Sequence, residues 1–128
     1  MKNVLLDSHA LVFAPSQPEL LSPKVRRLPQ DSESERWVSV VSLWEIAVKV
    51  QIGKLSLPLD AAYYHRHLAA RSVRTLGVTV EHSLALLRLP LHHRDPFDRL
   101  LIAQASEENL TLVTRDRAFR RYQVECVW

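Results

Sequence analysis

Short, continuous apolar runs alternate along the chain with longer stretches in which apolar side chains recur every three or four residues. The runs are typical of strands buried in a parallel sheet, and the longer stretches are typical of helices that bury one face. Strands that alternate with helices predict an α/β sandwich with a mostly parallel sheet. The expected strands are Val4–Leu6, Trp37–Val40, Arg74–Val78, Leu110–Thr114 and Tyr122–Val127.

Capping residues indicate where the helices begin. Ser22-Pro23 and Asp95-Pro96 each place a capping side chain before proline, which is tolerated at the first helical position because it has no N–H to lose. Ser42 and Glu45 match a capping box for a helix ending near Ile52, with Gly53 as its C-terminal cap. Further helices are expected at Ala10–Ala14, Ala61–Arg71 and Arg117–Arg121, and after Thr79. Pro15 and Pro18 break the first of these, and Asp60 caps the second. The helix after Thr79 carries Val80, Leu84 and Leu87 at helical spacing.

Length and composition predict one soluble globular domain spanning residues 1–128. The 47% hydrophobic and 24% charged residues are near the average for such proteins. The 17 Lys and Arg against 14 Asp and Glu give a net charge of +3, which is compatible with a phosphate-rich partner. A single cysteine, Cys126, excludes an internal disulfide and a thiolate metal cluster, so we expect a reducing cytoplasm. No apolar run approaches the ~20 residues of a membrane span.

Four acidic residues stand where ligands bind in α/β folds. Asp7 and Asp116 follow expected strands, Glu45 lies just beyond the second expected strand, and Asp98 is in the first turn of a helix. The carboxyl ends of parallel strands and the helix N-termini face one rim of the sheet. Four carboxylates gathered there would repel one another unless a cation neutralised them, and oxygen-only ligands favour Mg²⁺ or Mn²⁺.

Such a site suits in-line displacement at phosphate. A divalent ion lowers the pKa of its bound water, polarises a phosphoryl oxygen and neutralises developing charge. The four acids are therefore predicted metal ligands, one of which could also orient or deprotonate the attacking water. Lys49 and Arg99 are candidates to hold the substrate backbone or to tune the acids.

Each acid also has an ordinary structural explanation when it is taken alone. The helix dipole favours acids in a first turn, Glu45 could complete its capping box or pair with Lys49, and Asp116 could cap a helix. The occurrence of four such residues on one predicted rim favours catalysis. A zinc site at His92-His93 or His65/His67 is a weaker alternative, because neither pair has the i,i+4 spacing that would aim both rings at one ion.

Other residues have both a functional and a structural interpretation. Trp37 and Trp44 are assigned to the core rather than to stacking on a ligand. A group of arginines could form either a phosphate-contacting face or an ordinary solvated surface. This group consists of Arg71, Arg74, Arg115, Arg117, Arg120 and Arg121.

Family motifs stand in four segments of the chain, which are Leu5–Leu11, Ser42–Lys49, His93–Ala105 and Leu112–Asp116. Together they resemble the PIN-domain family, and more narrowly the VapC-type toxins of type II toxin–antitoxin pairs. The resemblance covers nearly the whole chain in the right order and is weakest over Phe13–Arg36, where the family is variable. It implies a PIN-like, three-layer α/β/α sandwich with a short, mostly parallel central sheet.

The resemblance also implies an activity, a metal and partners. It implies a metal-dependent endoribonuclease that uses Mg²⁺ or Mn²⁺ and acts on tRNA, rRNA or mRNA. It implies a homodimer, and an inhibitory antitoxin whose basic tail occupies the acidic pocket. The residues in the family's four acidic positions are Asp7, Glu45, Asp98 and Asp116.

Several neighbouring residues take supporting roles by the same resemblance. Thr114 matches the hydroxyl residue that supports the last acid, and Ser8 stands where threonine is more usual. Asp95 is expected to cap its helix while Asp98 faces the metal. His93 and Arg94 are candidates to meet RNA or the antitoxin.

Other functions fit the acids less well. A phosphatase of the haloacid-dehalogenase type needs a second acid two residues after Asp7, where this chain has His9. A nuclease of branched or flapped DNA normally carries larger insertions. The alternative that stays open is a non-catalytic binding module whose acidic pocket grips a basic partner segment.

Overall fold

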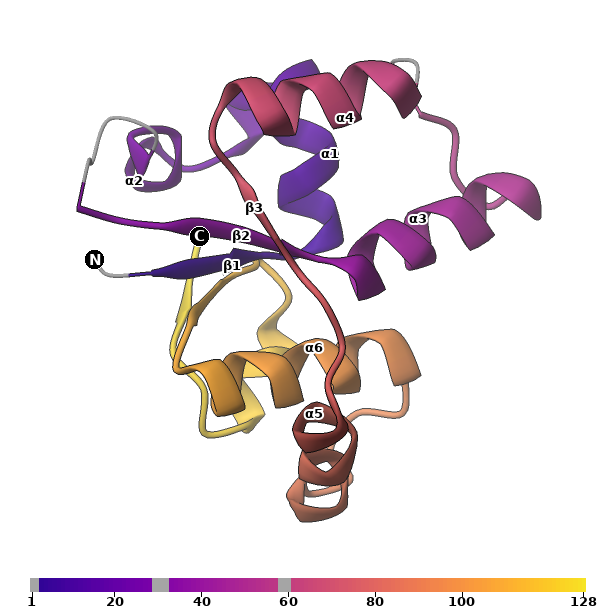
Figure 1. The fold of residues 1–128 in the computed structure, drawn as a ribbon, viewed down its shortest axis with the longest axis vertical. Helices are drawn as coiled ribbons and strands as arrows, with labels where there is room; N and C mark the ends of the chain where they lie inside the picture. Colours follow the sequence, from indigo (N-terminus) through magenta and orange to yellow (C-terminus); the bar gives the residue numbers. More distant parts are fainter. Residues whose placement is uncertain (1–2, 29–32, 58–60) are drawn as a thin grey trace.

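Five short parallel strands form the central sheet of the computed structural model, which describes residues 3–28, 33–57 and 61–128 (Figure 1). They are β1 (Val4–Leu6), β2 (Arg36–Ser39), β3 (Arg74–Leu76), β4 (Thr111–Val113) and β5 (Cys126–Val127). Their order in the sheet is β3-β2-β1-β4-β5, and each pairing is parallel. All five expected strands are therefore confirmed, although β3, β4 and β5 are shorter than the sequence predicts.

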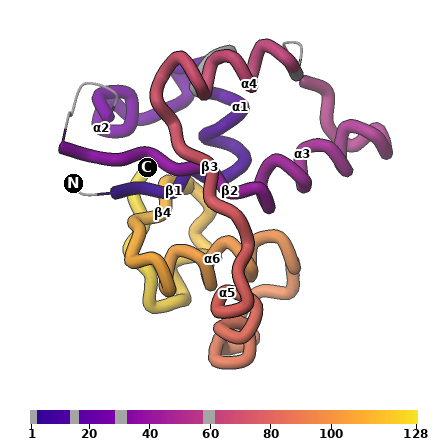
Figure 2. Tube along the Cα trace, in the orientation of Figure 1, coloured from indigo at the N-terminus to yellow at the C-terminus, as the bar shows by residue number. Residues whose placement is uncertain are grey.

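Helices cover both faces of this sheet (Figures 1 and 2). One face carries α1 (Ser8–Ser16), α2 (Pro23–Arg26) and α4 (Ala61–Ala70), and the other carries α5 (Val80–Ala85) and α6 (Pro96–Glu108). α3 (Val40–Gln51) leaves the end of β2 and contacts both α1 and α6. The connections include 3₁₀ turns η1 (Pro18–Leu20), η3 (Leu86–Arg88) and η4 (Arg117–Arg121). No described helix has the length and apolar character needed to cross a membrane.

Alternating residues of β1 supply the cores on the two faces. Val4 and Leu6 pack into a cluster with side chains of α1 and α2, whereas Leu5 packs into a second cluster with α6 and Phe119. This division follows from the two-residue period of a strand, which sends successive side chains to opposite faces. The predicted three-layer α/β/α sandwich is confirmed.

The start of α3 differs from the predicted one. Ser39, at the end of β2, caps the helix by accepting a hydrogen bond from the Val41 amide at 3.0 Å. Ser42 therefore lies inside the first turn, and the capping box predicted for it with Glu45 is wrong. The Ser42 hydroxyl is buried and has no hydrogen-bond partner among the described residues. The predicted end is confirmed, because Gly53 follows the helix with a φ of +78°, where glycine is favoured.

The other helix boundaries mostly agree with the sequence. Side chains of Ser22, Thr79 and Asp95 cap their helices as predicted. α1 was expected to break at Pro15 but continues to Ser16, because the Gln17 amide donates to the Phe13 carbonyl at 2.9 Å and prolongs the last turn. α2 ends at Arg26, before the end near Leu28 that the sequence predicts for the helix starting at Ser22-Pro23. Asp60, the predicted cap of α4, lies outside the described residues.

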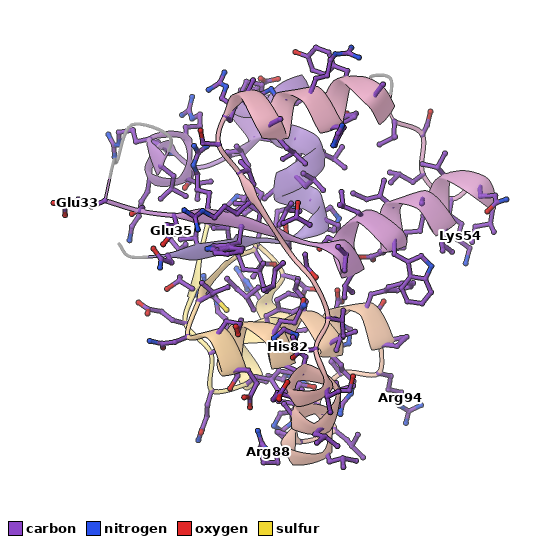
Figure 3. All side chains as sticks on the ribbon, viewed as in Figure 1. Glu33, Glu35, Lys54, His82, Arg88 and Arg94 are labelled. Atoms are coloured by element: carbon purple, nitrogen blue, oxygen red, sulfur yellow. The ribbon has the colours of Figure 1, made fainter. Side chains whose placement is uncertain are left out.

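A buried polar network fixes α6 against the end of β2. The Ser39 hydroxyl donates to Gln104 Oε1, and Gln104 Nε2 donates to the Gly77 carbonyl at 3.2 Å. The same Nε2 lies 3.4 Å from His82 Nδ1, which accepts the Thr79 amide at 3.0 Å. His82 sits between α5 and α6 (Figure 3) and is 1% exposed. The network thus gives the buried side chains of Ser39 and Gln104 hydrogen-bond partners within the fold.

Candidate active site

Asp7 lies at the carboxyl end of β1, the middle strand of the sheet. Its Oδ1 caps α1 by accepting a hydrogen bond from the Ala10 amide at 2.8 Å, and the residue is only 4% exposed. Burial raises the pKa of Asp7 and the charge of Glu45 adds to this, whereas hydrogen bonds from Ala10 and Thr114 oppose the rise. The fold thus removes this carboxylate from water without giving it a full counter-charge.

Asp116 stands beyond the end of β4, beside Asp7. Its amide donates to Thr114 Oγ1 at 3.1 Å, and its Oδ1 accepts from the Ala118 amide at 2.9 Å, which starts η4. Thr114 is buried and also hydrogen-bonds Asp7. One hydroxyl therefore links the acids at the ends of β1 and β4, while Asp116 itself stays exposed.

The first turn of α6 brings a second pair of acids. Asp95 Oδ1 accepts from the amides of Phe97 at 2.9 Å and Asp98 at 3.1 Å. Asp98 Oδ2 lies 2.7 Å from His93 Nε2. Burial raises the pKa of Asp98 to about 6, helped by the charges of Asp95 and Glu45 and opposed by His93. Asp98 is therefore a carboxylate crowded by two others.

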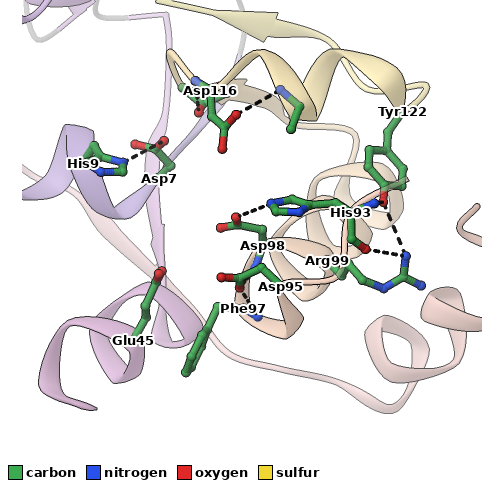
Figure 4. A network of polar contacts seen from close by, with 12 residues as sticks. Asp7, His9, Glu45, His93, Asp95, Phe97, Asp98, Arg99, Asp116 and Tyr122 are labelled. Carbon is green, nitrogen blue, oxygen red and sulfur yellow. Dashed lines mark hydrogen bonds and ion pairs between the residues drawn. The ribbon is translucent and has the colours of Figure 1, made fainter. Parts of the chain in front are cut away.

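The acids converge at one edge of the sheet, from the ends of β1 and β4 and from α3 and α6 (Figure 4). Ligand atoms of Glu45, Asp95 and Asp98 lie within 4.8 Å of one another, and so do those of His93, Asp98 and Asp116. Asp98 belongs to both groups. Asp7 belongs to neither, but it faces them closely enough for the charge of Glu45 to act on it. We call Asp7, Glu45, Asp95, Asp98 and Asp116 the acidic site.

The donor set of the acidic site fits a hard divalent cation. Its ligand atoms are mostly carboxylate oxygens, which suit Mg²⁺ and Mn²⁺, with one imidazole nitrogen nearby. Crowded carboxylates raise one another's pKa, and a bound divalent charge removes that repulsion. Either group of neighbouring ligand atoms, Glu45 with Asp95 and Asp98 or Asp98 with His93 and Asp116, would hold such an ion, with Asp7 close by.

Lys49 places a positive charge beside the acids. Its Nζ lies 2.6 Å from Glu45 Oε2, one turn away on α3. The hydrogen bond to Glu45 and the charges of Glu45, Asp95 and Asp98 raise the pKa of Lys49, against a smaller effect of burial. Lys49 therefore offsets part of the negative charge of the acidic site. Ser8, the first residue of α1, lines a small pocket with Glu45 and Lys49.

Arg99, the second candidate cation, does not face the acids. Its guanidinium donates to the carbonyls of Pro90 at 2.9 Å and Leu86 at 3.4 Å, and to Tyr122 Oη at 3.4 Å. Tyr122 Oη in turn accepts from the His93 amide at 2.9 Å. Successive residues on a helix point about 100° apart, so Arg99 leaves α6 in a different direction from Asp98. Its contacts hold the loop that carries His93.

Two features of the acidic site were not expected from the sequence. His93, a candidate for contacts with RNA or a partner, contacts Asp98. Asp95, expected only to cap α6, also lies within reach of Glu45 and Asp98. The signal was their spacing: His93 and Asp95 are two residues apart just before the helix, so both fall beside its first turn. Among the described residues, neither histidine pair weighed for zinc has both rings in one group of potential ligands, although His93 alone groups with Asp98 and Asp116.

The two tryptophans differ in environment. Trp37 is half-buried and packs against the core around Leu5, as expected. Trp44 is 60% exposed and meets Phe97 edge-on, with ring centroids 4.9 Å apart, so its assignment to the core is wrong. The physical reason is that α3 extends beyond the sheet, which leaves this side of the helix without a layer above it (Figure 1).

Comparison with known proteins identifies the class of this fold and site. The sequence profile of the PIN domain matches residues 4–125, so the chain belongs to the PIN-domain family. The chain is 32% identical over 124 residues to ribonuclease VapC22 of Mycobacterium tuberculosis, and the match covers 96% of this chain and 94% of that protein.

Solved structures share the fold at lower identity. DNA-bound VapBC from Salmonella typhimurium matches with a TM-score of 0.73 and 16% identity, over 99% of this chain and 98% of that one. VapBC2 from Rickettsia felis, bound to a promoter DNA fragment, matches with a TM-score of 0.71 and 16% identity, over 98% and 97% of the two chains. The arrangement of helices and strands is therefore that of these toxin–antitoxin proteins.

Proposed function

We propose that residues 1–128 form one metal-dependent endoribonuclease domain and that it acts as the toxin of a toxin–antitoxin pair. The observation that carries this proposal is the position of Asp98, whose carboxylate is shared by two groups of potential ligands. The similarity to a ribonuclease of 32% identity favours RNA as the substrate. Catalysis and metal binding are assigned to Asp7, Glu45, Asp98 and Asp116.

The residues around the acidic site support the chemistry in different ways. A divalent cation held by the carboxylates would polarise a phosphate oxygen and make a water molecule easier to ionise. Asp116 is exposed at the mouth and can hold a water there through its free carboxylate oxygen. His93 orients Asp98 through their 2.7 Å contact, and Thr114 orients Asp7 and Asp116. If the Lys49 ammonium group moves away from Glu45, it can pair with a phosphate oxygen of the RNA and neutralise its charge.

An antitoxin fits the surface beside the acids. A cavity of about 610 Å³ lies between α1, α3 and α4, with mostly apolar walls. Val12 and Ile46 line both this cavity and the small pocket that contains Glu45 and Lys49. The buried Tyr64 hydroxyl, on the wall of the large cavity, has no hydrogen-bond partner among the described residues. An apolar helix followed by a basic tail would fill the cavity and reach the acids.

A homodimer is part of the same proposal. Val80, Leu84, Leu87 and Leu91 form an apolar stripe along α5 and η3, and they are between 54% and 85% exposed. The stripe carries no charge, so the same stripe of a second copy can cover it in a two-fold interface without leaving an unpaired charge. Light scattering should show dimers for the antitoxin-free protein and monomers for Leu87→Glu.

The decisive experiment is cleavage of a pool of tRNA and rRNA by the purified, antitoxin-free protein. Reactions contain Mg²⁺, Mn²⁺ or chelator, and Asp98→Asn is run beside them. Glu107→Gln is the matched control, because it removes one carboxylate from the same helix at a position paired with Arg88. We expect discrete, metal-dependent fragments from the wild type and the control, and none from Asp98→Asn.

Two outcomes contradict the proposal in different ways. Equal cleavage by Asp98→Asn would remove Asp98 from the site. The second outcome is that the RNA stays intact in every reaction that contains metal, although the protein is folded and its melting temperature rises with Mn²⁺. The protein would then be a non-catalytic module whose acids bind a basic partner segment.

A further inference from the structure

A second cavity lies beside α1, on the face of the sheet that also carries α2 and α4. It has a volume of about 400 Å³ and is lined by residues of α1, α2, the α4 region and the start of β2. Leu11, Leu21 and Val25 supply apolar walls. A cavity of this size can hold one small-molecule unit. We call it the arginine pocket, after Arg26, Arg36 and Arg71, which line it together with Tyr63 and His67.

The arginine pocket concentrates positive charge without acidic partners. Among residues 3–28, 33–57 and 61–128, none of Arg26, Arg36 and Arg71 is in a salt bridge. The Arg36 guanidinium donates to the main-chain carbonyl of Arg71, so it is held at the pocket wall. Burial and the charge of Arg71 lower the pKa of Arg36, and burial with the charges of both arginines lowers the pKa of His67. These cations repel one another, and a bound anion would relieve the repulsion.

An aromatic surface stands beside these cations. The rings of Tyr63 and His67, one turn apart on α4, are stacked with an interplanar angle of 22° and centroids 6.2 Å apart. Tyr63 is 41% exposed, so its ring is open to a ligand. Ring surfaces beside guanidinium groups are the combination with which proteins hold single-stranded nucleic acid, because bases stack on rings and phosphates pair with arginine.

We propose that the arginine pocket binds one nucleotide of single-stranded RNA away from the acidic site, with its phosphate at Arg36 and Arg71 and its base against Tyr63. This inference rests on the proposed function, because it takes RNA to be the substrate. The acidic site repels the phosphate backbone wherever a cation does not neutralise it, so affinity must come from elsewhere on the surface. The positive pocket also disfavours a basic antitoxin tail, which leaves it open to the RNA.

The test measures binding separately from cleavage. A fluorescent, unstructured 10-nucleotide RNA is titrated in chelator with full-length protein carrying Asp98→Asn, so that no cutting occurs. Fluorescence anisotropy then gives the Kd at several salt concentrations. Arg36→Gln/Arg71→Gln should raise the Kd at least 10-fold and flatten the slope of log Kd against log salt by about 1.4, as for two lost phosphate contacts. Tyr63→Leu should raise the Kd about 5- to 20-fold with the salt slope unchanged.

A matched control removes the same charge elsewhere. Arg88→Gln/Arg121→Gln neutralises two arginines around a cavity on the α5–α6 side of the sheet and should change the Kd less than about threefold. Because Arg36 begins β2, Arg26→Gln/Arg71→Gln is a second double variant that leaves the sheet untouched. Circular dichroism melts establish that each variant is folded.

The outcomes separate this inference from the proposed function. Equal weakening by the Arg88/Arg121 control, or no weakening by either pocket variant, would overturn the inference even if the wild type cleaves RNA. Displacement of the RNA by a penta-glutamate peptide as readily as by unlabelled RNA would assign the pocket to acidic peptides and also overturn it. Pocket-dependent RNA binding by a protein that never cuts RNA would support the inference while the nuclease proposal fails.

Discussion

The buried network of Ser39, Gln104 and His82 and the acidic site both depend on α6, but they satisfy their polar groups differently. In the network, donors and acceptors match one another, and the only nearby charge is Glu108, 3.6 Å from His82 Nε2. In the acidic site, carboxylates from several elements crowd one another, and Lys49 offsets only part of their charge. Matched neutral groups need nothing further, whereas unneutralised like charges need a ligand. The first arrangement therefore stabilises the fold, and the second is suited to function.

The largest expected effect comes from Asp98→Asn. It should reduce RNA cleavage at least about 100-fold, since it removes the ligand shared by both groups. In chelator, the same variant should be more stable than the wild type, because Asp95 and Glu45 no longer repel a charge at this position. Initial cleavage rates and urea unfolding in chelator measure the two effects. A variant less stable than wild type would show that Asp98 is a structural residue.

Gln104→Leu should have the opposite effect on stability. It leaves the Gly77 carbonyl without its donor and should lower the free energy of unfolding by about 1–3 kcal/mol, with or without metal. The melting temperature should fall by roughly 3–10 °C. Gln123→Leu is the matched control at an exposed position, with an expected change within about 0.5 kcal/mol. Equal melting temperatures for both variants would contradict the role given to the network.

The pH dependence of metal binding should follow Asp98. Its pKa of about 6 means that protons compete with the metal below that pH, so affinity for Mn²⁺ should rise about 10-fold from pH 5 to pH 7. Folding in chelator changes in the other direction. The folded state binds this proton more tightly than the unfolded chain, so the contribution of Asp98 to stability falls as pH rises from about 4 to about 6. Calorimetric titrations and urea unfolding at pH 5, 6 and 7 measure both trends, and both should be much weaker in Asp98→Asn.

Asp95→Asn should give the smallest effect. Asparagine caps a helix about as well as aspartate, so the free energy of unfolding should change by less than about 0.5 kcal/mol. The lost charge should weaken Mn²⁺ binding about 3- to 5-fold, because Asp95 flanks Glu45 and Asp98. If Asp95→Asn binds Mn²⁺ as weakly as Asp98→Asn does, Asp95 is a principal metal ligand. If its affinity for Mn²⁺ is unchanged, Asp95 serves only as the cap of α6.

Local sequence signals accounted for most of the fold. Apolar runs located the strands because a buried parallel strand needs apolar side chains on both faces, and Ser22, Thr79 and Asp95 located helix starts because their side chains satisfy the first free amides. The errors lie where one local signal competed with another. Ser42 and Glu45 match the sequence pattern of a capping box. Ser39, however, precedes them in the chain and hydrogen-bonds Gln104 in the interior, and Ser39 is the residue that caps α3. Trp44 looks apolar in sequence, yet no second layer covers this side of α3.

The sequence by itself singled out the candidate residues for the chemistry: the acids at positions 7, 45, 98 and 116 stand after strands or at helix starts, and parallel topology turns such positions toward one edge of the sheet. Only the tertiary structure decided how they associate. It drew His93 and Asp95 into the acidic site, turned Arg99 toward the carbonyls of its own loop, and gathered Arg26, Arg36 and Arg71 from three separate elements into one pocket. The physical reason is that capping and apolar periodicity act between residues close in sequence. Distances between charges on different elements depend on how those elements pack.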